Sequence, residues 1–142
     1  MLTTLVVRIL IGLYRRTCED TGSHALWSPV AQAVACMEAH FRSKELSLDK
    51  LAAEAKLSER QFSRLFRKQV GMSYITYLHN LRIDAACRMM KSSLDSIPSI
   101  ASAVGYLDMK FFRRLFKRKT GLTPGQYRTA SLANRAPAVS AE

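Results

Sequence analysis

Residues 51–71 read LAAEAKLSERQFSRLFRKQVG, and residues 100–121 read IASAVGYLDMKFFRRLFKRKTG. The two stretches align on the pattern Phe-x-Arg-Leu-Phe, which begins at Phe62 and returns 50 residues later at Phe112. Upstream of this pattern the offset is 49, because one residue is inserted near Leu107. A match in this detail indicates that one supersecondary unit occurs twice in the chain.

The first copy is predicted to form two short helices joined by a turn. Apolar residues at helical spacing predict a helix over 48–55, and Ser47 stands where a residue that caps its N-terminus is expected. Ser58 is predicted to cap a second helix over 59–70, which Gly71 ends in the left-handed conformation.

The second copy repeats this plan. A helix is predicted to begin at Ser96 or Ser99 and to end at the turn made by Gly105. Asp108 then caps a helix over 109–120, which is the counterpart of the helix over 59–70. Each copy therefore reads as a helix-turn-helix unit.

Between the copies, residues 74–91 contain neither Pro nor Gly and are predicted to form one connecting helix. At a rise of 1.5 Å per residue this helix would be about 27 Å long. Its apolar face is expected to comprise Ile75, Leu78, Leu81, Ala85 and Met89. Two recognition helices held apart by such a spacer are expected to enter successive major grooves, about 34 Å apart along one face of a DNA duplex.

The chain is strongly basic, and its excess positive charge is concentrated in the duplicated half. Of 142 residues, 22 are Lys or Arg and 11 are Asp or Glu, and 14 of the basic but only four of the acidic residues lie within 58–128. A polyanionic partner is therefore expected, either nucleic acid or an anionic membrane surface. A membrane-surface protein would carry its charge on one long amphipathic helix, whereas here the charge recurs at matched positions of two short helices.

In the helices predicted over 59–70 and 109–120, the apolar stripe is assigned to the core, and the remaining side chains are mostly basic. Those in the first two turns are expected to read base edges, because an arginine fork donates two hydrogen bonds to guanine; they are Arg60, Ser63, Arg64, Met109, Lys110, Arg113 and Arg114. Those further along are expected to contact phosphates: Arg67, Lys68, Lys117, Arg118 and Lys119. Met109 fits either a surface position or contact with a thymine methyl group.

The three cysteines, Cys18, Cys36 and Cys87, predict neither a disulfide framework nor a zinc site, because their number is odd and no CxxC spacing occurs. Cys36 lies one helical turn from His40, but no orienting acid is evident, so no enzyme is predicted. No metal or cofactor is expected, and the cytoplasm is the expected compartment.

Residues 47–128 resemble the DNA-binding domain of the AraC/XylS family of bacterial transcription regulators. The resemblance rests on LAAEAKLS, FSRLFRKQVG, LRIDAACRMM and the closing stretch IASAVGYLDMKFFRRLFKRKTGLTPGQYR. It implies an all-α fold of two helix-turn-helix subdomains bridged by a long central helix, base-reading positions on the residues already named, and transcriptional activation through RNA polymerase. Lys56 departs from the family pattern, since Gly is usual at that turn and a left-handed backbone is mildly strained for other residues.

The resemblance divides the chain into three parts: 1–28, the DNA-binding domain over 29–130, and a flexible tail over 131–142. In the first part, apolar residues at helical spacing predict an amphipathic helix, which is expected to be a dimerisation segment or the remnant of a missing domain; they are Leu2, Leu5, Val6, Ile9, Leu10 and Leu13. The alternative function is that of a cationic membrane-surface or non-specific nucleic-acid-binding protein.

Overall fold

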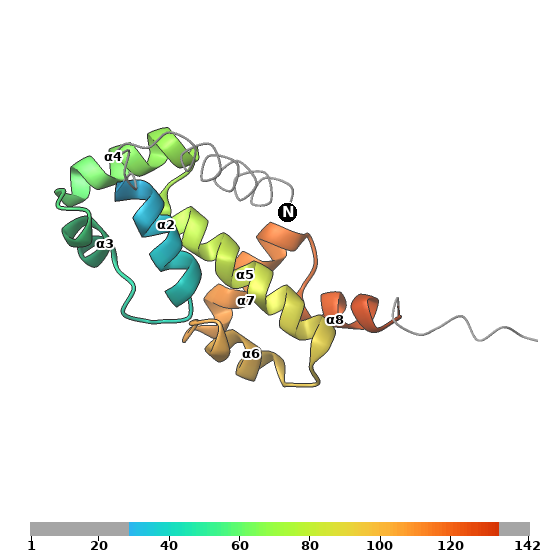
Figure 1. Ribbon diagram of the computed structural model, residues 1–142. Coiled ribbons are helices and arrows are strands. Elements are labelled where there is room, and N and C mark those ends of the chain that lie inside the picture. The colour runs from blue at the N-terminus through green and yellow to red at the C-terminus, as the bar shows by residue number, and fades with distance from the viewer. Residues whose placement is uncertain (1–28, 134–142) are drawn as a thin grey trace, which may run out of the picture. The chain divides into compact units, whose positions relative to one another are not determined.

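The computed structural model describes residues 29–133, which form seven α-helices and no strand within that range (Figure 1). The helices are α2 (Pro29–His40), α3 (Leu48–Glu54), α4 (Glu59–Val70), α5 (Tyr74–Ser92), α6 (Ile97–Ala103), α7 (Met109–Thr120) and α8 (Pro124–Ala133). The predicted all-α class and the two helix-turn-helix pairs, α3 with α4 and α6 with α7, are confirmed.

The chain divides into two compact units, the first ending at Leu81 and the second beginning at Arg82. The boundary falls within α5, so the long helix predicted between the two repeats contributes residues to both units. Each unit thus contains one helix-turn-helix pair together with part of α5.

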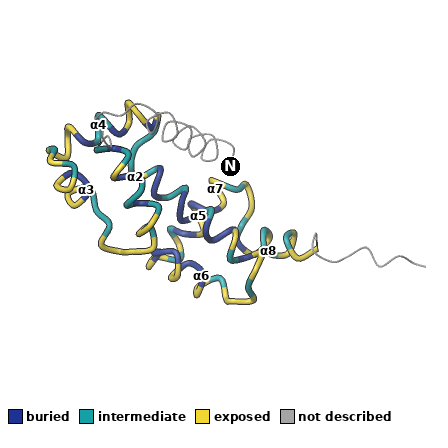
Figure 2. Tube along the Cα trace, in the orientation of Figure 1, coloured by how far each residue is buried: buried dark blue, intermediate teal, exposed yellow. Residues whose placement is uncertain are grey.

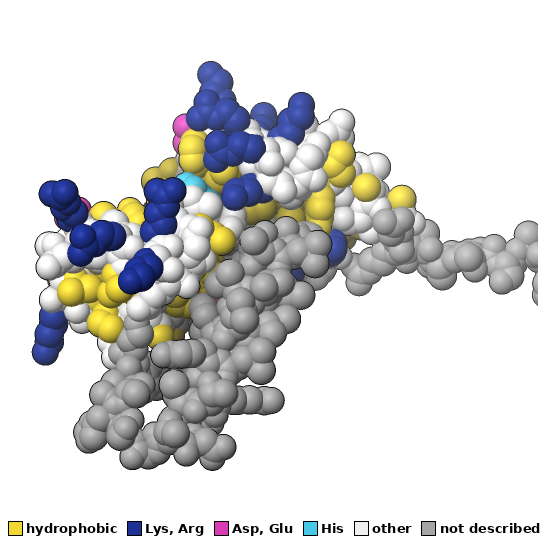
Figure 3. Space-filling model, turned by 90° about the horizontal axis from the view of Figure 1, so that it is seen from above, with side chains coloured by type: hydrophobic (Ala, Val, Ile, Leu, Met, Phe, Trp, Pro, Cys, Tyr) yellow, Lys and Arg dark blue, Asp and Glu magenta, His cyan; other side chains and the backbone are white. Residues whose placement is uncertain are grey.

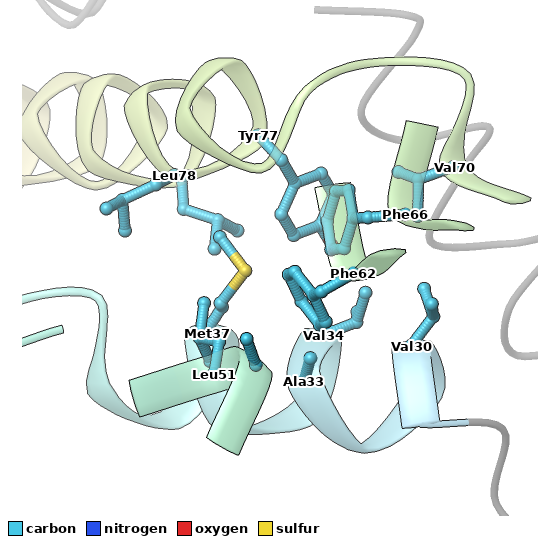
Figure 4. Packing of buried hydrophobic residues seen from close by; sticks show 12 residues of the cluster. Val30, Ala33, Val34, Met37, Leu51, Phe62, Phe66, Val70, Tyr77 and Leu78 are labelled. Carbon is cyan, nitrogen blue, oxygen red and sulfur yellow. The ribbon is translucent and has the colours of Figure 1, made fainter. Parts of the chain in front are cut away.

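In the first unit, aromatic rings from α4 form the centre of the core. Phe62 and Phe66 are fully buried, with their ring centroids 5.7 Å apart, and Phe66 meets the ring of Tyr77 edge-on at 5.9 Å. Figure 4 shows these side chains and Met37 of α2 pointing toward one another. The Tyr77 hydroxyl donates a hydrogen bond to the Glu38 carboxylate at 3.1 Å, which satisfies the polar end of an otherwise buried side chain.

The second unit has an equivalent aromatic core around α7. Phe112 lies 5.3 Å from the ring of Tyr106 and 5.6 Å from that of Phe116, and Phe116 meets Tyr127 of α8 edge-on at 5.4 Å. The repeated Phe-x-Arg-Leu-Phe pattern therefore places two fully buried phenylalanines on the inner face of α4 and two on the inner face of α7. Exposed residues separate these buried ones along both helices (Figure 2).

Local sequence signals begin and end α4 and α7 where predicted. At the start of α4 the Ser58 hydroxyl accepts a hydrogen bond from the Gln61 amide, while the Gln61 side chain accepts one from the Ser58 amide at 3.1 Å. At the start of α7 there is no such reciprocal pair, and the Asp108 carboxylate accepts hydrogen bonds from the backbone amides of Lys110 and Phe111 at 2.8 and 3.1 Å. Ser47 precedes α3 as expected, but its side chain makes no capping hydrogen bond.

Between residues 29 and 133 the backbone is left-handed at four positions, of which three are glycine. Gly71 and Gly121 end α4 and α7 with φ of 80°, and Gly105 follows α6 with φ of 93°. The fourth is Lys56, whose φ of 54° confirms that a non-glycine residue occupies the strained position in the first turn.

Three details of the predicted fold were wrong. Ile75 is 41% exposed instead of lying on the buried face of α5, where Tyr77 is buried in its place, because the first turn of α5 presents Tyr77 to the rings of α4. The helix predicted to reach residue 55 ends at Glu54, with Ala55 as its C-cap. The tail was predicted to begin at residue 131, whereas α8 continues to Ala133.

The predicted amphipathic helix over 1–28 lies outside the described residues. Among the helices that are described, none combines the length and the apolar character needed to cross a bilayer.

Candidate nucleic-acid interface

The outer face of α4 carries the residues predicted to contact DNA in the first unit. Arg60, Arg64, Arg67 and Lys68 are exposed, and Ser63 is half-buried. Phe62, Phe66 and Val70 are buried on the opposite side, because residues three and four apart fall on one face of a helix. Burial of the phenylalanines therefore fixes which side chains α4 presents to solvent.

The outer face of α7 carries the equivalent set in the second unit. Six basic residues are exposed and Met109 is half-buried; the six are Lys110, Arg113, Arg114, Lys117, Arg118 and Lys119. Phe112, Leu115 and Phe116 are buried behind them. The structure thus places all the residues predicted to contact DNA on the solvent-facing sides of two helices, one in each unit.

The positive charge of these helices is not neutralised by neighbouring acids. Within the part of the chain that the structure describes, none of the ten basic residues on α4 and α7 forms an ion pair, and Glu59 is the acidic residue of α4, whereas α7 has none. In Figure 3, Lys and Arg side chains (dark blue) stand out from the surface with few acidic side chains (magenta) among them. These charges are therefore available to a polyanion.

Position along the helix separates charges that stabilise the helix from charges that do not. Lysines and arginines in the last turns of α4 and α7 interact favourably with the negative end of the helix dipole, so they benefit the fold even without a ligand. Arg60 and Lys110 are the second residues of their helices, at the positive end of the dipole, where a cation is unfavourable. The helix dipole therefore does not favour a cation at this position in either helix, and an anionic ligand would interact favourably with both.

One contact on α7 was not predicted from the sequence. Phe111 is half-buried and lies under the Arg114 guanidinium, whose Cζ is 5.7 Å from the ring centroid. The three-residue separation of Phe111 and Arg114 on one helix is the signal that could have revealed this contact. Leu107, near which the second repeat carries its inserted residue, is 75% exposed immediately before the cap of α7.

The family models match a helix-turn-helix domain to residues 51–130 of the chain. Among curated proteins, the transcriptional activator RhaR of Escherichia coli K12 is 38% identical over 120 residues, which are 84% of this chain and 42% of RhaR. The transcriptional regulator MtrA of Neisseria gonorrhoeae is 34% identical over 84 residues, or 59% of this chain and 28% of MtrA. The chain therefore spans less than half the length of these relatives.

Solved structures agree with the sequence matches. The DNA-binding domain of AdpA, a global transcriptional factor solved in complex with a target DNA, superposes with a TM-score of 0.72 at 31% identity, covering 78% of this chain and 98% of that domain. The C-terminal domain of AraT, a response regulator from Geobacillus stearothermophilus, gives a TM-score of 0.70 at 30% identity, covering 75% of this chain and 88% of that one.

The matched proteins are DNA-binding regulators and not enzymes, which confirms the prediction that this chain is not an enzyme. Taken with the two helix-turn-helix units and their basic outer faces, these matches establish that the chain belongs to the AraC/XylS family of bacterial DNA-binding transcription regulators.

Proposed function

We propose that the protein recognises a specific site in double-stranded DNA by inserting α4 and α7 into successive major grooves, and so regulates transcription. The observation that carries the proposal is the matched pair of cations, Arg60 and Lys110, at the N-terminal ends of two helices whose dipoles disfavour them. A recognition helix presents its N-terminal residues to base edges, so these are the positions where a DNA-binding function needs polar side chains.

The side chains on the outer faces of α4 and α7 then fall into two groups by their position along the helix, one that contacts base edges and one that contacts phosphates. In the first two turns, Arg60, Ser63 and Arg64 of α4 contact base edges, as do Met109, Lys110, Arg113 and Arg114 of α7. Arginine suits this role because its planar fork donates two hydrogen bonds to O6 and N7 of guanine. Further along, Arg67, Lys68, Lys117, Arg118 and Lys119 contact phosphates, which strengthens binding and fixes the register without choosing a sequence.

The effect on transcription is activation, with RNA polymerase as the second partner and the bacterial cytoplasm as the compartment. Support for activation comes from the likeness to RhaR, which is itself named a transcriptional activator. We also propose that residues 1–28 pair two copies of the chain, because their apolar residues repeat at helical spacing in the sequence.

Selection of bound fragments from a random double-stranded library tests the proposal. The expected result is enrichment of one sequence motif, whose binding then weakens with added salt because counterions are released on contact with phosphates. Vesicles of anionic lipid, titrated over the same salt series, provide the comparison. Vesicle binding without motif enrichment would favour a membrane-surface protein, and DNA binding without enrichment would favour a non-specific one.

A further inference from the structure

A row of contacts between guanidinium groups and aromatic rings in the second unit leads from a buried arginine to an exposed one. The guanidinium of Arg82, on α5, lies 5.5 Å from the ring centroid of Tyr106. The Tyr106 ring lies 6.1 Å from the ring of Phe111, and the guanidinium of Arg114 lies 5.7 Å from the Phe111 ring. Cations within about 6 Å of a ring centroid are attracted by the negative face of the ring.

The inner part of this row is held in place by the core. Tyr106 is 6% exposed and packs on Phe112 at 5.3 Å as well as on Phe111. Arg82 is 8% exposed, and burial lowers the pKa of its guanidinium while the neighbouring Tyr106 raises it. The Phe111 ring therefore packs on the buried ring of Tyr106, and it in turn supports the side chain of Arg114.

An exposed arginine ordinarily samples many rotamers, and fixing one of them on binding costs conformational entropy. A ring beneath the guanidinium reduces that cost, because the flat cation lies on the ring before DNA arrives. Preorganisation of this kind makes the arginine contact with a base more selective, because that contact depends on the direction of two parallel hydrogen bonds.

The first unit has no equivalent arrangement. The repeat aligns Phe111 with Gln61, whose side chain accepts the hydrogen bonds that cap α4. The cap of α7 does not use the side chain of residue 111, because the Asp108 carboxylate accepts both capping hydrogen bonds. Within the described residues, Arg64 has no ring contact like that of Arg114, although both are the sixth residue of their helices.

We propose that Phe111 is a positioning residue for base recognition, which holds the Arg114 guanidinium in the orientation that reads one base pair. The inference rests on the proposed function, because it requires Arg114 to contact a base. It assigns the second helix-turn-helix unit a preorganised arginine, and the first unit a mobile one.

The test measures the DNA affinity of three variants of the full chain, Phe111→Leu, Phe111→Tyr and Arg114→Ala, and of the unsubstituted protein. The DNA is the selected site and a panel of sites that each differ from it by one base pair. Arg114→Ala identifies the base pair that this arginine reads. At that base pair Phe111→Leu is expected to lower the ratio of matched to mismatched affinity about two- to fivefold, which is the size of an exposed cation–π contact. Phe111→Tyr is expected to keep the ratio, because it keeps the ring.

Tyr127→Leu provides a matched control, since Tyr127 is also half-buried and also has a cation over its ring, that of Lys91 at 5.8 Å. It is expected to leave discrimination at every base pair unchanged. If Phe111→Leu lowers affinity for all sequences alike, or leaves the ratio at the Arg114 base pair intact, Phe111 is structural and the inference is wrong. If Arg114→Ala lowers discrimination at no base pair, the proposed role of Arg114 itself is wrong. Circular dichroism of each variant checks that the fold is retained.

Discussion

Arg64→Ala and Arg114→Ala are expected to relax the choice of DNA sequence at two different base pairs. Both arginines are exposed, both are the sixth residue of a 12-residue helix, and both follow a fully buried phenylalanine by two residues. The repeat therefore gives them the same position relative to the core of their own unit. If α4 and α7 occupy successive major grooves, the two relaxed base pairs lie about 10 base pairs apart.

The magnitude follows from what each alanine removes. A bidentate contact between arginine and guanine supplies about 1–3 kcal/mol of discrimination, so each variant is expected to lose about 5- to 150-fold in the ratio of matched to mismatched affinity. The cost to folding is small, because Arg64 forms no ion pair in the described part of the chain and an exposed substitution usually changes stability by less than about 0.5 kcal/mol.

Competition binding measured by fluorescence anisotropy checks this prediction, with each base pair of the selected site replaced in turn. The double variant should show both losses, each at its own base pair. Relaxation of the same base pair by both variants would refute the placement of the two helices in separate grooves. Equal weakening on the selected site and on random DNA would refute base contact by these arginines.

Lys117→Ala should weaken binding to specific and random duplexes equally and should reduce the slope of log K against log salt by about 0.9, as measured in a salt titration. Lys56→Gly should raise the free energy of unfolding by about 0.5–1 kcal/mol, because it relieves the left-handed backbone at φ of 54°, whereas Gly71→Ala should lower it by about 1 kcal/mol; urea unfolding measures both. Burial, with the hydrogen bond to Cys87, raises the pKa of Tyr127 to about 12. Because the folded chain retains the proton longer than the unfolded one, stability should fall as the pH rises from about 10 toward 12, and Tyr127→Phe should lessen that fall in melts between pH 9 and 12.

The bounds of the two recognition helices could be predicted because their signals are local. Ser58 and Gly71 begin and end α4 through hydrogen bonds within a few residues, and Asp108 and Gly121 do so for α7. The faces of these helices were predicted for the same reason, since two phenylalanines four residues apart define a buried side.

The buried face of α5 could not be predicted from periodicity alone. This helix contributes residues to the cores of two units, so its buried residues extend beyond a single stripe and include Arg82, Ile83 and Cys87. Which residue of its first turn is buried depends on where the ring of Phe66 lies, and that contact selects Tyr77 over Ile75.

The support beneath Arg114 was missed because it depends on residues distant in sequence. Phe111 and Arg114 are neighbours on one helix, but the ring is held by Tyr106, which precedes α7, and by contacts that reach Arg82 on α5. A periodic pattern assigns a residue to a face, and it does not reveal which side chains stack on that face.

The outward side chains of α4 and α7 differ even though their buried residues repeat, since Arg60 and Ser63 of the one correspond to Lys110 and Arg113 of the other. Under the proposed function a single bound molecule therefore recognises a site without two-fold symmetry, and reversing that site reverses the direction of the bound protein relative to the gene. Placing the selected site upstream of a reporter gene in each of its two orientations should give unequal expression. The site itself is not expected to be a palindrome.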